Sequence, residues 1–468
     1  MSELPGSLTE AAHLIATRRL SPVELTRAAL ARAGRLNLRL YAFIRITEDL
    51  ALNHARAAEA RQMAGTLRGP LDGVPIAHKD IFATAGIPTT AHSRILLDHV
   101  PQRDAAAVEA WARAGAVMLG KLATHEFAMG GPSFDLPWPP PRNPWDASRS
   151  TGGSSSGTGA AVAAGMILGG TGSDTGGSVR LPATLCGVAG MKPTYGLASR
   201  RGILPLSHSM DTAGVLAWTA EDCAILLQPM LGHDPEDPSS ASQPAPDVLS
   251  GLRGGVRGLR VGAVRHFHET DLPATPAVRN GVEHVLDVLH AEGAEIREAV
   301  LPPLRDFHAA GWTILMAEAL AIHEPWLRIR FHDYGEILRE RLALSTLISG
   351  SDLVQAQRRR RELCNAVAAA MRDCDLLVTA GQPREAPVLE RISKWAPIEE
   401  PNLTVPFNVT GQPVIAVCTG HGEGGLPVGA QIAGRPFEDA TVLRAAHTFE
   451  RATAAMRRRP LLRFDLRP

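Results

Sequence analysis

The chain has 468 residues, of which 45% are hydrophobic and 21% charged, with 48 acidic and 48 basic side chains. This size and balance are typical of a globular protein with a large buried core, and they argue against nucleic acid as a partner. No apolar run is long enough to predict a membrane span, and the five scattered cysteines favour reduced thiols in a cytoplasm.

The first third of the chain alternates predicted helices and strands. Segments 7–20 and 21–36 each open with a serine and carry an early glutamate, which is typical of capped helices. Residues 69–82 run from a turn into a short apolar strand that ends at Lys79. Residues 104–120 predict an Asp-capped helix followed by a strand at 116–120. This alternation predicts an α/β fold.

The middle of the chain predicts three different structures. Residues 132–148 are rich in proline and aromatic side chains, which predicts an irregular loop. Residues 157–170 are small and apolar, which predicts a buried helix rather than a flexible linker. Residues 233–257 are rich in proline, serine and glycine, and we expect them to form a surface connection.

The last part of the chain combines long helices with strands. Helical periodicity occupies residues 276–292, 306–345 and 352–373, and a final helix is predicted at 438–455. Residues 374–380 and 413–420 are apolar runs of strand length.

The lysine content is unusually low. Arginine supplies nearly all of the positive charge, and lysine occurs only at positions 79, 121, 192 and 394. Arginine stays protonated in proteins, whereas lysine can lose its proton when it is desolvated. A lysine that persists in such a chain is therefore a candidate for a role that arginine cannot fill.

The segment "SDTGGSVR", residues 173–180, has features of a nucleophile loop. A serine hydroxyl needs a base to remove its proton, and the oxyanion that forms needs donors fixed in advance. The Gly-Gly pair before Ser178 allows backbone N–H groups to converge, although an ordinary strand-to-helix turn also explains the pattern. His78 and His125 lie near candidate segments without an acidic motif, so a Ser-His-Asp triad stays open.

Together, three segments resemble the amidase signature family of hydrolases. They are "GVPIAHKDIFATAGIPTTAHS", the long block that begins "TGGSSSGTGAAVAAG" and ends "GMKPTYG", and the late "PFNVTGQPVIAVCTG" with "GLPVGAQIAG". The resemblance implies an α/β fold with a mixed central sheet covered by helices on both faces. It also implies a single domain over residues 1–468, with a signature core at 69–214, the surface connection at 233–257, a variable substrate-side region at 258–400 and a sheet-completing part at 401–468.

The resemblance implies a Ser–cis-Ser–Lys triad. Lys79 matches the catalytic lysine, Ser154 the bridging serine that follows a cis peptide bond, and Ser178 the nucleophile. Burial behind an apolar strand favours the neutral amine of Lys79, which can then accept a proton. The residues expected to form the oxyanion hole are Thr175, Gly176, Gly177 and Ser178.

Other positions receive supporting roles. Ser155, Asp174 and Arg180 are expected to hold the loop, and Met129, Gly130 and Gly131 to line the acyl pocket. Lys121 and Lys192 are interpreted as structural, and Lys394 as part of a variable surface. The chain departs from the family's usual G-G-S-S-G-G-S at Ser156 and Thr158, and we expect activity to survive that change.

The implied function is amidase activity on a small amide, an aryl amide or a carbamate, with no metal and no cofactor. The alternative is the glutamine-hydrolysing subunit of a tRNA-dependent amidotransferase, although no residues for free glutamine are evident. A non-enzymatic binding protein is disfavoured by the intact triad, and a homodimer is left open. The apolar loop at 131–145 and the helix at 311–327 are candidates for the substrate pocket, or for plain core packing.

Overall fold

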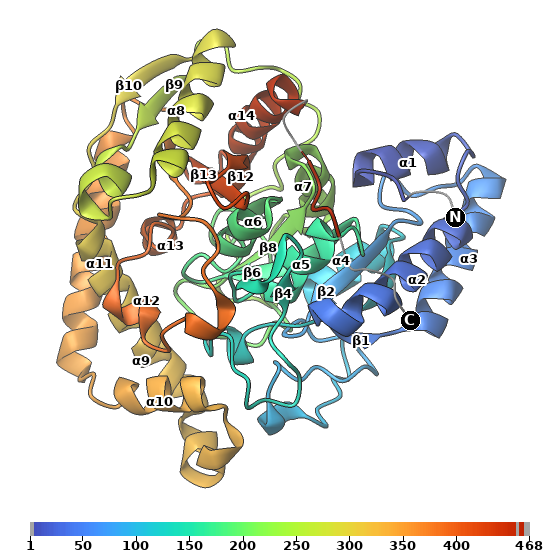
Figure 1. The fold of residues 1–468 in the computed structure, drawn as a ribbon, viewed down its shortest axis with the longest axis horizontal. Coiled ribbons are helices and arrows are strands. Elements are labelled where there is room, and N and C mark those ends of the chain that lie inside the picture. Colours follow the sequence, from blue (N-terminus) through green and yellow to red (C-terminus); the bar gives the residue numbers. More distant parts are fainter. Residues whose placement is uncertain (1–3, 455–457, 463–468) are drawn as a thin grey trace.

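The computed structural model describes residues 4–454 and 458–462. A large mixed β-sheet forms the centre of the fold (Figure 1). Its strands are β1 (Phe43–Ile46), β2 (Pro75–Lys79), β3 (Val117–Leu122), β6 (Gly169–Asp174), β7 (Ala189–Lys192), β8 (Thr212–Ala217), β9 (Arg260–Ala263), β10 (Glu295–Glu298), β11 (Leu376–Ala380), β12 (Val414–His421) and β13 (Pro427–Gly434). Within the described residues the 11 strands follow the order β1-β3-β2-β6-β8-β7-β12-β13-β11-β9-β10. β2 is parallel to β3 and β6, whereas β6 and β8 are antiparallel. The predicted α/β fold with a mixed sheet is therefore confirmed.

Helices cover both faces of this sheet (Figure 1). They are α1 (Leu8–Ala16), α2 (Pro22–Leu40), α3 (Glu48–Ala64), α4 (Ala106–Arg113), α5 (Ser156–Ala163), α6 (Arg180–Cys186), α7 (Ala220–Leu227), α8 (Pro276–Ala291), α9 (Leu304–Arg330), α10 (Glu336–Ser345), α11 (Gly350–Ala370), α12 (Ala396–Glu399), α13 (Pro406–Val409) and α14 (Asp439–Ala452). Successive side chains of a strand point to opposite faces. In β8, Val215 and Ala217 accordingly join the core that contains α7, whereas Leu216 joins the core that contains α5 and α6.

The predicted N-terminal helices form, and their caps are of the expected kind. The Ser7 hydroxyl accepts a hydrogen bond from the Glu10 amide, and the Ser21 hydroxyl accepts from the amides of Val23 and Glu24. The predicted cap at Asp104 is wrong. α4 begins after Ala105, and the Asp104 carboxylate instead accepts from the amide of Ala85 on a neighbouring loop.

Two predictions in the middle of the chain need correction. The helix expected over 157–170 ends at Ala163, because Gly165 adopts a left-handed φ of 64°, and Gly169–Asp174 then enters the sheet as β6. The loop expected over 132–148 contains a short hairpin of β4 (Arg142–Asn143) and β5 (Asp146–Ser150). Residues 233–257 contain neither helix nor strand, as expected of a connection.

The C-terminal predictions largely hold. The helical stretch at 306–345 divides into α9 and α10, and α9 accommodates Pro325 near its end. β11, β12 and α14 lie where strands and the last helix are expected. Residue 455, the end of the predicted helix, lies outside the described residues, as do residues 463–468.

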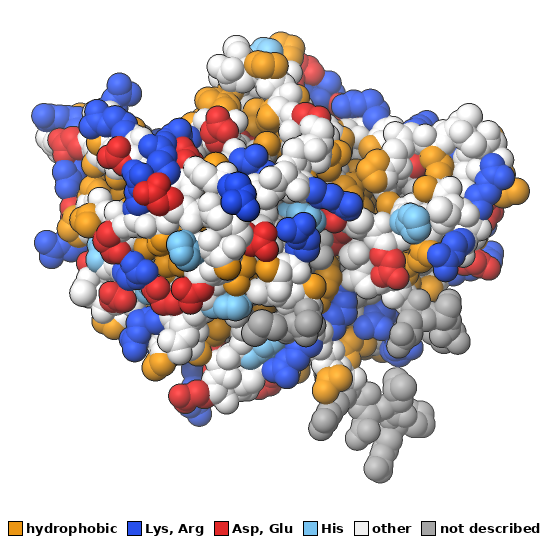
Figure 2. Space-filling model, turned by 90° about the horizontal axis from the view of Figure 1, so that it is seen from above, with side chains coloured by type: hydrophobic (Ala, Val, Ile, Leu, Met, Phe, Trp, Pro, Cys, Tyr) orange, Lys and Arg blue, Asp and Glu red, His pale blue; other side chains and the backbone are white. Residues whose placement is uncertain are grey.

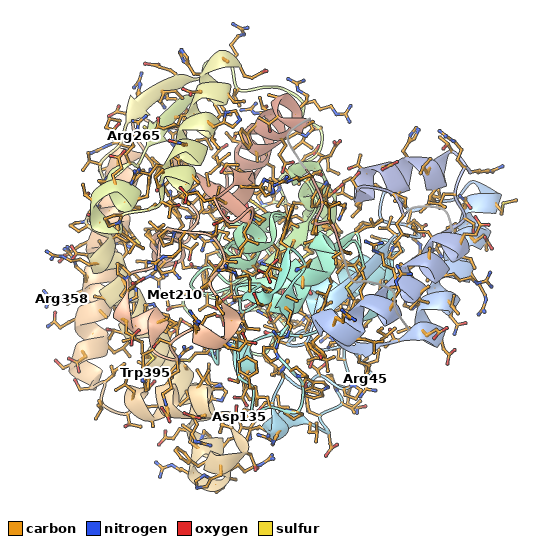
Figure 3. The ribbon with its side chains drawn as sticks, viewed as in Figure 1. Arg45, Asp135, Met210, Arg265, Arg358 and Trp395 are labelled. Carbon is orange, nitrogen blue, oxygen red and sulfur yellow. The ribbon has the colours of Figure 1, made fainter. Side chains whose placement is uncertain are left out.

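The outer surface carries both signs of charge. Figure 2 shows acidic and basic side chains interspersed on one face, and Figure 3 places Arg265 and Arg358 at the outer edge of the molecule, with Met210 in its interior. Within the described part of the chain, no helix is both long and apolar enough to cross a membrane.

Candidate active site

A cavity of about 560 Å³ lies beside the loops that follow β5 and β6. Ser154 reaches it from the loop between β5 and α5, and Ser178 from the loop between β6 and α6. Lys79 ends β2, which is the parallel neighbour of β6, and its backbone amide donates to the Thr171 hydroxyl in β6 at 2.9 Å. The sheet therefore brings the three predicted triad segments to one place.

The Lys79 amine is buried between two serine hydroxyls. Nζ lies 2.7 Å from Ser154 Oγ and 2.9 Å from Ser173 Oγ, and the side chain has no exposed surface. Burial lowers the pKa of Lys79 to about 7, although the carboxylates of Asp174 and Asp211 oppose this change. Near neutral pH, a large fraction of Lys79 is therefore an uncharged amine with a lone pair for a proton.

The bridging segment is tightly held. The peptide bond between Gly153 and Ser154 is cis, at the position that the resemblance implies. The Ser154 carbonyl accepts from the His125 amide at 3.1 Å and from the Thr124 hydroxyl at 2.9 Å, while the Ser155 amide donates to the Ser178 carbonyl at 3.1 Å. A side chain at position 153 would collide with the His125 ring, since its Cβ would lie 2.0 Å from Cε1. These contacts join the Ser154 loop to the Ser178 loop.

The four residues predicted to form the oxyanion hole all line the cavity. The structure gives the Gly177 amide another partner, because it donates to the Asp174 carboxylate at 2.8 Å. Across the described chain, no protein acceptor takes the amides of Thr175, Gly176 or Ser178. These three N–H groups are the ones that an oxyanion in the cavity could use.

Gly177 fits only as glycine. Its φ is 122°, and an added Cβ would lie 1.9 Å from Thr404 Oγ1. The Thr404 hydroxyl in turn donates to the Gly176 carbonyl at 2.6 Å. The C-terminal part of the chain therefore packs directly against the nucleophile loop.

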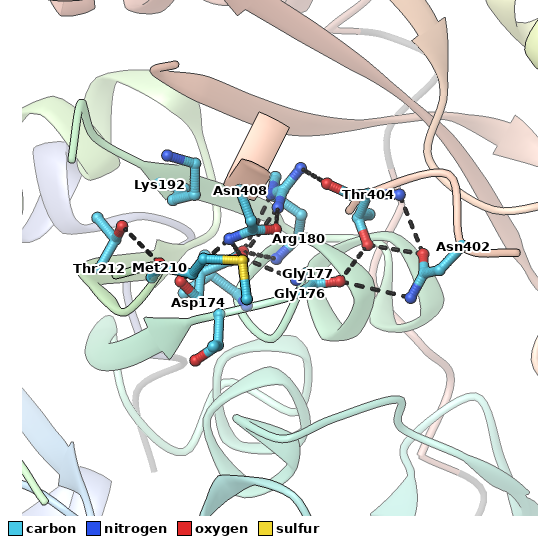
Figure 4. Close-up of polar contacts among 12 residues, drawn as sticks. Asp174, Gly176, Gly177, Arg180, Lys192, Met210, Thr212, Asn402, Thr404 and Asn408 are labelled. Atoms are coloured by element: carbon cyan, nitrogen blue, oxygen red, sulfur yellow. Dashed lines mark hydrogen bonds and ion pairs between the residues drawn. The ribbon is translucent and has the colours of Figure 1, made fainter. Parts of the chain in front are cut away.

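Arg180 and Asp174 form a buried ion pair beneath this loop (Figure 4). The Asp174 carboxylate also accepts from the amides of Gly177 and Val179. Burial alone would raise the pKa of Asp174, but the Arg180 guanidinium beside it outweighs that effect and holds the pKa well below its ordinary value. Arg180 further donates to Gln431 and Asn408, so every guanidinium nitrogen has an acceptor. Two of the three predicted supporting positions, Asp174 and Arg180, thus lie in one buried network.

The third supporting position, Ser155, contributes to β6 rather than to that network. Its hydroxyl donates weakly to the Ser173 carbonyl at 3.4 Å and accepts from the Ser173 amide at 3.3 Å. Ser155 therefore attaches the loop after Ser154 to the strand that carries Ser173, whose hydroxyl contacts Lys79.

Of the predicted acyl-pocket residues, Met129 and Gly131 line the cavity and Gly130 does not. The Gly130 amide donates to the Glu126 carbonyl at 2.9 Å instead. Beside them lies Arg341 of α10, which is 3% exposed and donates to the carbonyls of Met129 and Lys394. Burial lowers the pKa of Arg341 to about 10, and within the described residues no carboxylate pairs with it.

The two histidines that sequence analysis left open are both buried and neutral. Burial lowers the pKa of His78 to about 3 and that of His125 to about 3. The His125 ring lines the cavity, whereas the His78 ring packs on Trp111 with centroids 5.2 Å apart. Neither forms an ion pair with a carboxylate in the described part of the chain, so the geometry gives no support to a Ser-His-Asp triad.

The remaining lysines differ from Lys79 in their partners. Lys121 forms a buried ion pair with Asp80 and donates to the Phe82 carbonyl at 2.6 Å. Lys192 is also buried and donates to the Pro193 carbonyl, whereas Lys394 is partly exposed and pairs with Glu336 and Glu340. None of the three lines the cavity.

The unusual Ser156 and Thr158 fit without distortion. Ser156 opens α5, and its hydroxyl lies 3.5 Å from the Ser154 carbonyl. The Thr158 hydroxyl donates to the Thr171 carbonyl in β6 at 3.0 Å. Both side chains are buried and neither hydrogen-bonds to Lys79 within the described chain, and the survival of activity stays a prediction.

The aromatic side chains contribute less to the cavity than the sequence suggests. Trp312 and Leu315 of α9 line the cavity, together with Gly131 and Pro132 from the start of the loop at 131–145. Trp145 instead donates to the Cys186 carbonyl and packs on His421, and Phe134 is largely exposed. Much of the remaining wall comes from residues 381–403, for which the sequence offers no recognisable motif.

Sequence reasoning missed Ser173, Asp211, Arg341 and Thr404. Ser173 lies inside the quoted Gly/Ser block, and Asp211 follows that block within the expected core at 69–214. Proximity to the block was therefore an available signal for Ser173 and a weaker one for Asp211. Arg341 and Thr404 reach the site only through the fold, from α10 and from the turn before α13.

A family model described as Amidase matches residues 24–443. A curated relative from Chloroflexus aggregans, one of the subunits of its glutamyl-tRNA(Gln) amidotransferase, is 37% identical and covers 98% of this chain and 99% of its own length.

Solved structures resemble the chain over nearly its whole length. One is described as a vestigial protein complex that reveals the evolutionary origins of an s-triazine catabolic enzyme. It is 34% identical, has a TM-score of 0.89 and covers 95% of this chain and 98% of its own. A second is the native peptide amidase from Stenotrophomonas maltophilia, which is 29% identical, has a TM-score of 0.85 and covers 98% of each chain.

Proposed function

The chain belongs to the amidase family, and we propose that it hydrolyses a carbon–nitrogen amide bond of a small molecule through a serine acyl-enzyme. In this proposal Ser178 is the nucleophile, Ser154 relays its proton and Lys79 accepts it. Aryl amides and carbamates fall within the same chemistry.

The bond-making steps follow from these roles. Ser178 Oγ attacks the substrate carbonyl while its proton passes to Ser154, whose own proton passes to Lys79. The free amides of Thr175, Gly176 and Ser178 stabilise the oxyanion. Lys79 then returns the proton through Ser154 to the leaving nitrogen, and the C–N bond breaks. Water attacks the ester by the same relay, which releases the carboxylic acid and restores Ser178.

The observation that carries this proposal is the environment of Lys79. Its amine is fully buried and 2.7 Å from Ser154 Oγ, and within the described residues it has no carboxylate in an ion pair. A lysine in such surroundings loses its proton easily, which a general base requires.

The test replaces the nucleophile. Ser178→Ala is expected to abolish hydrolysis while the fold is retained, because the members of a triad act as a unit. Ser393→Ala is a matched control, since Ser393 also lines the cavity but lies outside the relay. A folded Ser178→Ala protein with turnover close to that of the parent would sink the proposal.

A second candidate function is the glutamine-hydrolysing subunit of a tRNA-dependent amidotransferase. The relative from Chloroflexus aggregans supports this candidate more directly than the first, because it is the more similar protein and matches almost end to end. Glutamine also carries a carboxylate, which suits the buried Arg341 at the cavity wall. The peptide amidase from Stenotrophomonas maltophilia supports a stand-alone enzyme instead.

A substrate panel separates the two candidates. The purified chain is assayed alone against aliphatic amides, anilides, carbamates and glutamine. A stand-alone amidase hydrolyses at least one non-glutamine class efficiently. An amidotransferase subunit hydrolyses glutamine slowly without partners and shows no broad amide activity.

A further inference from the structure

Asp211 lies opposite Thr175 at the point where two antiparallel strands end. In β6 and β8, Asp174 is the partner of Thr212. One residue after the end of β6 and one residue before the start of β8, backbone pairing stops and a side-chain contact takes its place. The Thr175 hydroxyl donates to Asp211 Oδ1 at 2.6 Å. The contact therefore extends the β6–β8 ladder into the nucleophile loop.

The other oxygen of Asp211 fixes a second loop. Oδ2 accepts from the Leu206 amide at 2.8 Å and from the Ser207 amide at 3.0 Å. The residue is 8% exposed, and among the described residues it forms no ion pair with a cation. A buried carboxylate is costly unless its donors are fixed, and here three donors converge on it. Asp211 is therefore held rigidly against Thr175.

Two cavities meet at Thr175. Thr175 lines the catalytic cavity and also a second cavity of about 190 Å³. Asp211 and Ser173 line only the second cavity, and Ser173 Oγ contacts Lys79 Nζ. Asp211 thus does not reach the space where a substrate binds, although it touches a residue that does.

We propose that Asp211 is a positioning residue: its carboxylate fixes Thr175, and thereby holds the unpaired amides of Thr175 and Gly176 in place for the oxyanion. This inference rests on the proposed serine mechanism. Donors that stabilise an oxyanion act mainly in the transition state, so their displacement lowers kcat more than it changes KM.

Asp211 also has an electrostatic effect that a purely structural residue lacks. The ionisable groups that face Lys79 are Asp174, Asp211 and His125. Both carboxylates raise the pKa of Lys79 against the effect of burial, while His125 stays neutral because burial lowers its pKa. Removal of the Asp211 charge therefore lowers the pKa of Lys79, and the acid limb of the kcat profile moves to lower pH.

The experiment compares three single variants of the full chain. Thr175→Val keeps the shape but removes the hydroxyl, and it is expected to lower kcat about tenfold or more with KM nearly unchanged and the acid limb unmoved. In Asp211→Asn the amide oxygen can accept from Leu206 and Ser207 while the amide NH2 donates to the Thr175 hydroxyl oxygen, so the contacts are kept and the charge is lost. The acid limb of its kcat profile is expected to move down by about one pH unit.

Asp222→Asn is the matched control. Asp222 is likewise buried and accepts from a threonine, through the Thr9 hydroxyl at 2.7 Å and the Thr9 amide at 2.8 Å, but it lies on α7 outside both cavities. We expect its kcat, KM and pH profile to match those of the parent.

The outcomes separate this inference from the proposed function. If Ser178→Ala is inactive but Thr175→Val keeps parental kcat and Asp211→Asn keeps the parental acid limb, the role of Asp211 is overturned and the serine mechanism stands. If Asp222→Asn moves the acid limb of the kcat profile as far as Asp211→Asn does, the shift is a general effect of removing a buried charge, and the inference fails. Should Asp211→Asn not fold, Thr175→Val still decides through its kcat and KM.

Discussion

Two fully buried lysines occupy neighbouring strands, and their surroundings differ in one decisive way. Lys79 ends β2, and Lys121 lies in the adjacent β3 opposite His78. Lys121 has a carboxylate 3.3 Å away and donates to the Phe82 carbonyl and the Thr89 hydroxyl. Among the described residues, the Lys79 amine hydrogen-bonds only to the hydroxyls of Ser154 and Ser173. Burial is thus common to both, and the acceptors decide which lysine stabilises the fold and which can exchange a proton.

The largest expected effect comes from Lys79→Arg. Arginine keeps the positive charge but stays protonated, so it cannot accept a proton from Ser154. General-base assistance is worth about 10²–10⁴-fold, and we expect kcat to fall by that order with the fold retained. Steady-state kinetics and circular dichroism measure the two quantities.

Lys394→Arg is the control for that variant, because Lys394 is partly exposed, pairs with Glu336 and Glu340, and does not line the cavity. Its kcat is expected to equal that of the parent. If Lys79→Arg retained most of its activity, the distinction between the two buried lysines would collapse, and His125 would become the next candidate base.

Lys121→Met examines the other half of the comparison. It leaves Asp80 buried without its cation, and the break of a buried ion pair costs about 3–5 kcal/mol of unfolding free energy. Urea denaturation measures the loss. Asp80→Asn added to Lys121→Met should recover part of it, since the uncompensated charge is then gone. A Lys121→Met protein as stable as the parent contradicts the structural role.

The pH dependence of kcat tests the difference between the two lysines in the unmodified protein. Burial lowers the pKa of Lys79 to about 7, and in the proposed mechanism the neutral amine is the active form, so protonation is expected to remove activity. We expect kcat to rise about tenfold per pH unit while the pH is below the pKa of Lys79, and to level off above that pKa. The limb should persist in any folded Lys121 variant. A flat profile between about pH 5.5 and 8.5 would contradict the assignment.

The smallest effect is expected for Ser156→Gly, which restores the usual family residue beside the relay. The Ser156 hydroxyl makes one long contact, at 3.5 Å, with the Ser154 carbonyl. Such a bond is worth about 1 kcal/mol or less, so kcat should change by less than about fivefold. A much larger change would show that this loop contributes to the proton-accepting environment of Lys79.

The sequence predicts the site where chemistry and local pattern coincide. Lys79 follows an apolar strand, and the resemblance to the amidase signature family assigns Ser154 and Ser178 within the Gly/Ser block, so their convergence could be expected before the fold was known. The α/β class and the ends of most elements follow from periodicity and caps. The predicted cap at Asp104 was wrong because its carboxylate accepts instead from the amide of Ala85, which is distant in sequence and near in space.

The missed residues depend on register and long-range packing. Asp211 meets Thr175 only because β6 and β8 pair with that alignment. Arg341 reaches the cavity from α10, and no nearby motif marks it. Much of the cavity wall comes from such unmarked residues, which explains why the reaction class is easier to infer than the substrate.

The buried arginine beneath the nucleophile loop has a consequence for synthesis of the chain. Arg180 is joined to Asn408 and Gln431, which follow it by 228 and 251 residues. A nascent chain on the ribosome that has exposed both active-site serines still lacks these acceptors, and Gly177 still lacks its packing against Thr404. The nucleophile loop is completed only after almost the whole polypeptide has been translated. We therefore expect chains that end before Gln431 to lack the proposed hydrolytic activity.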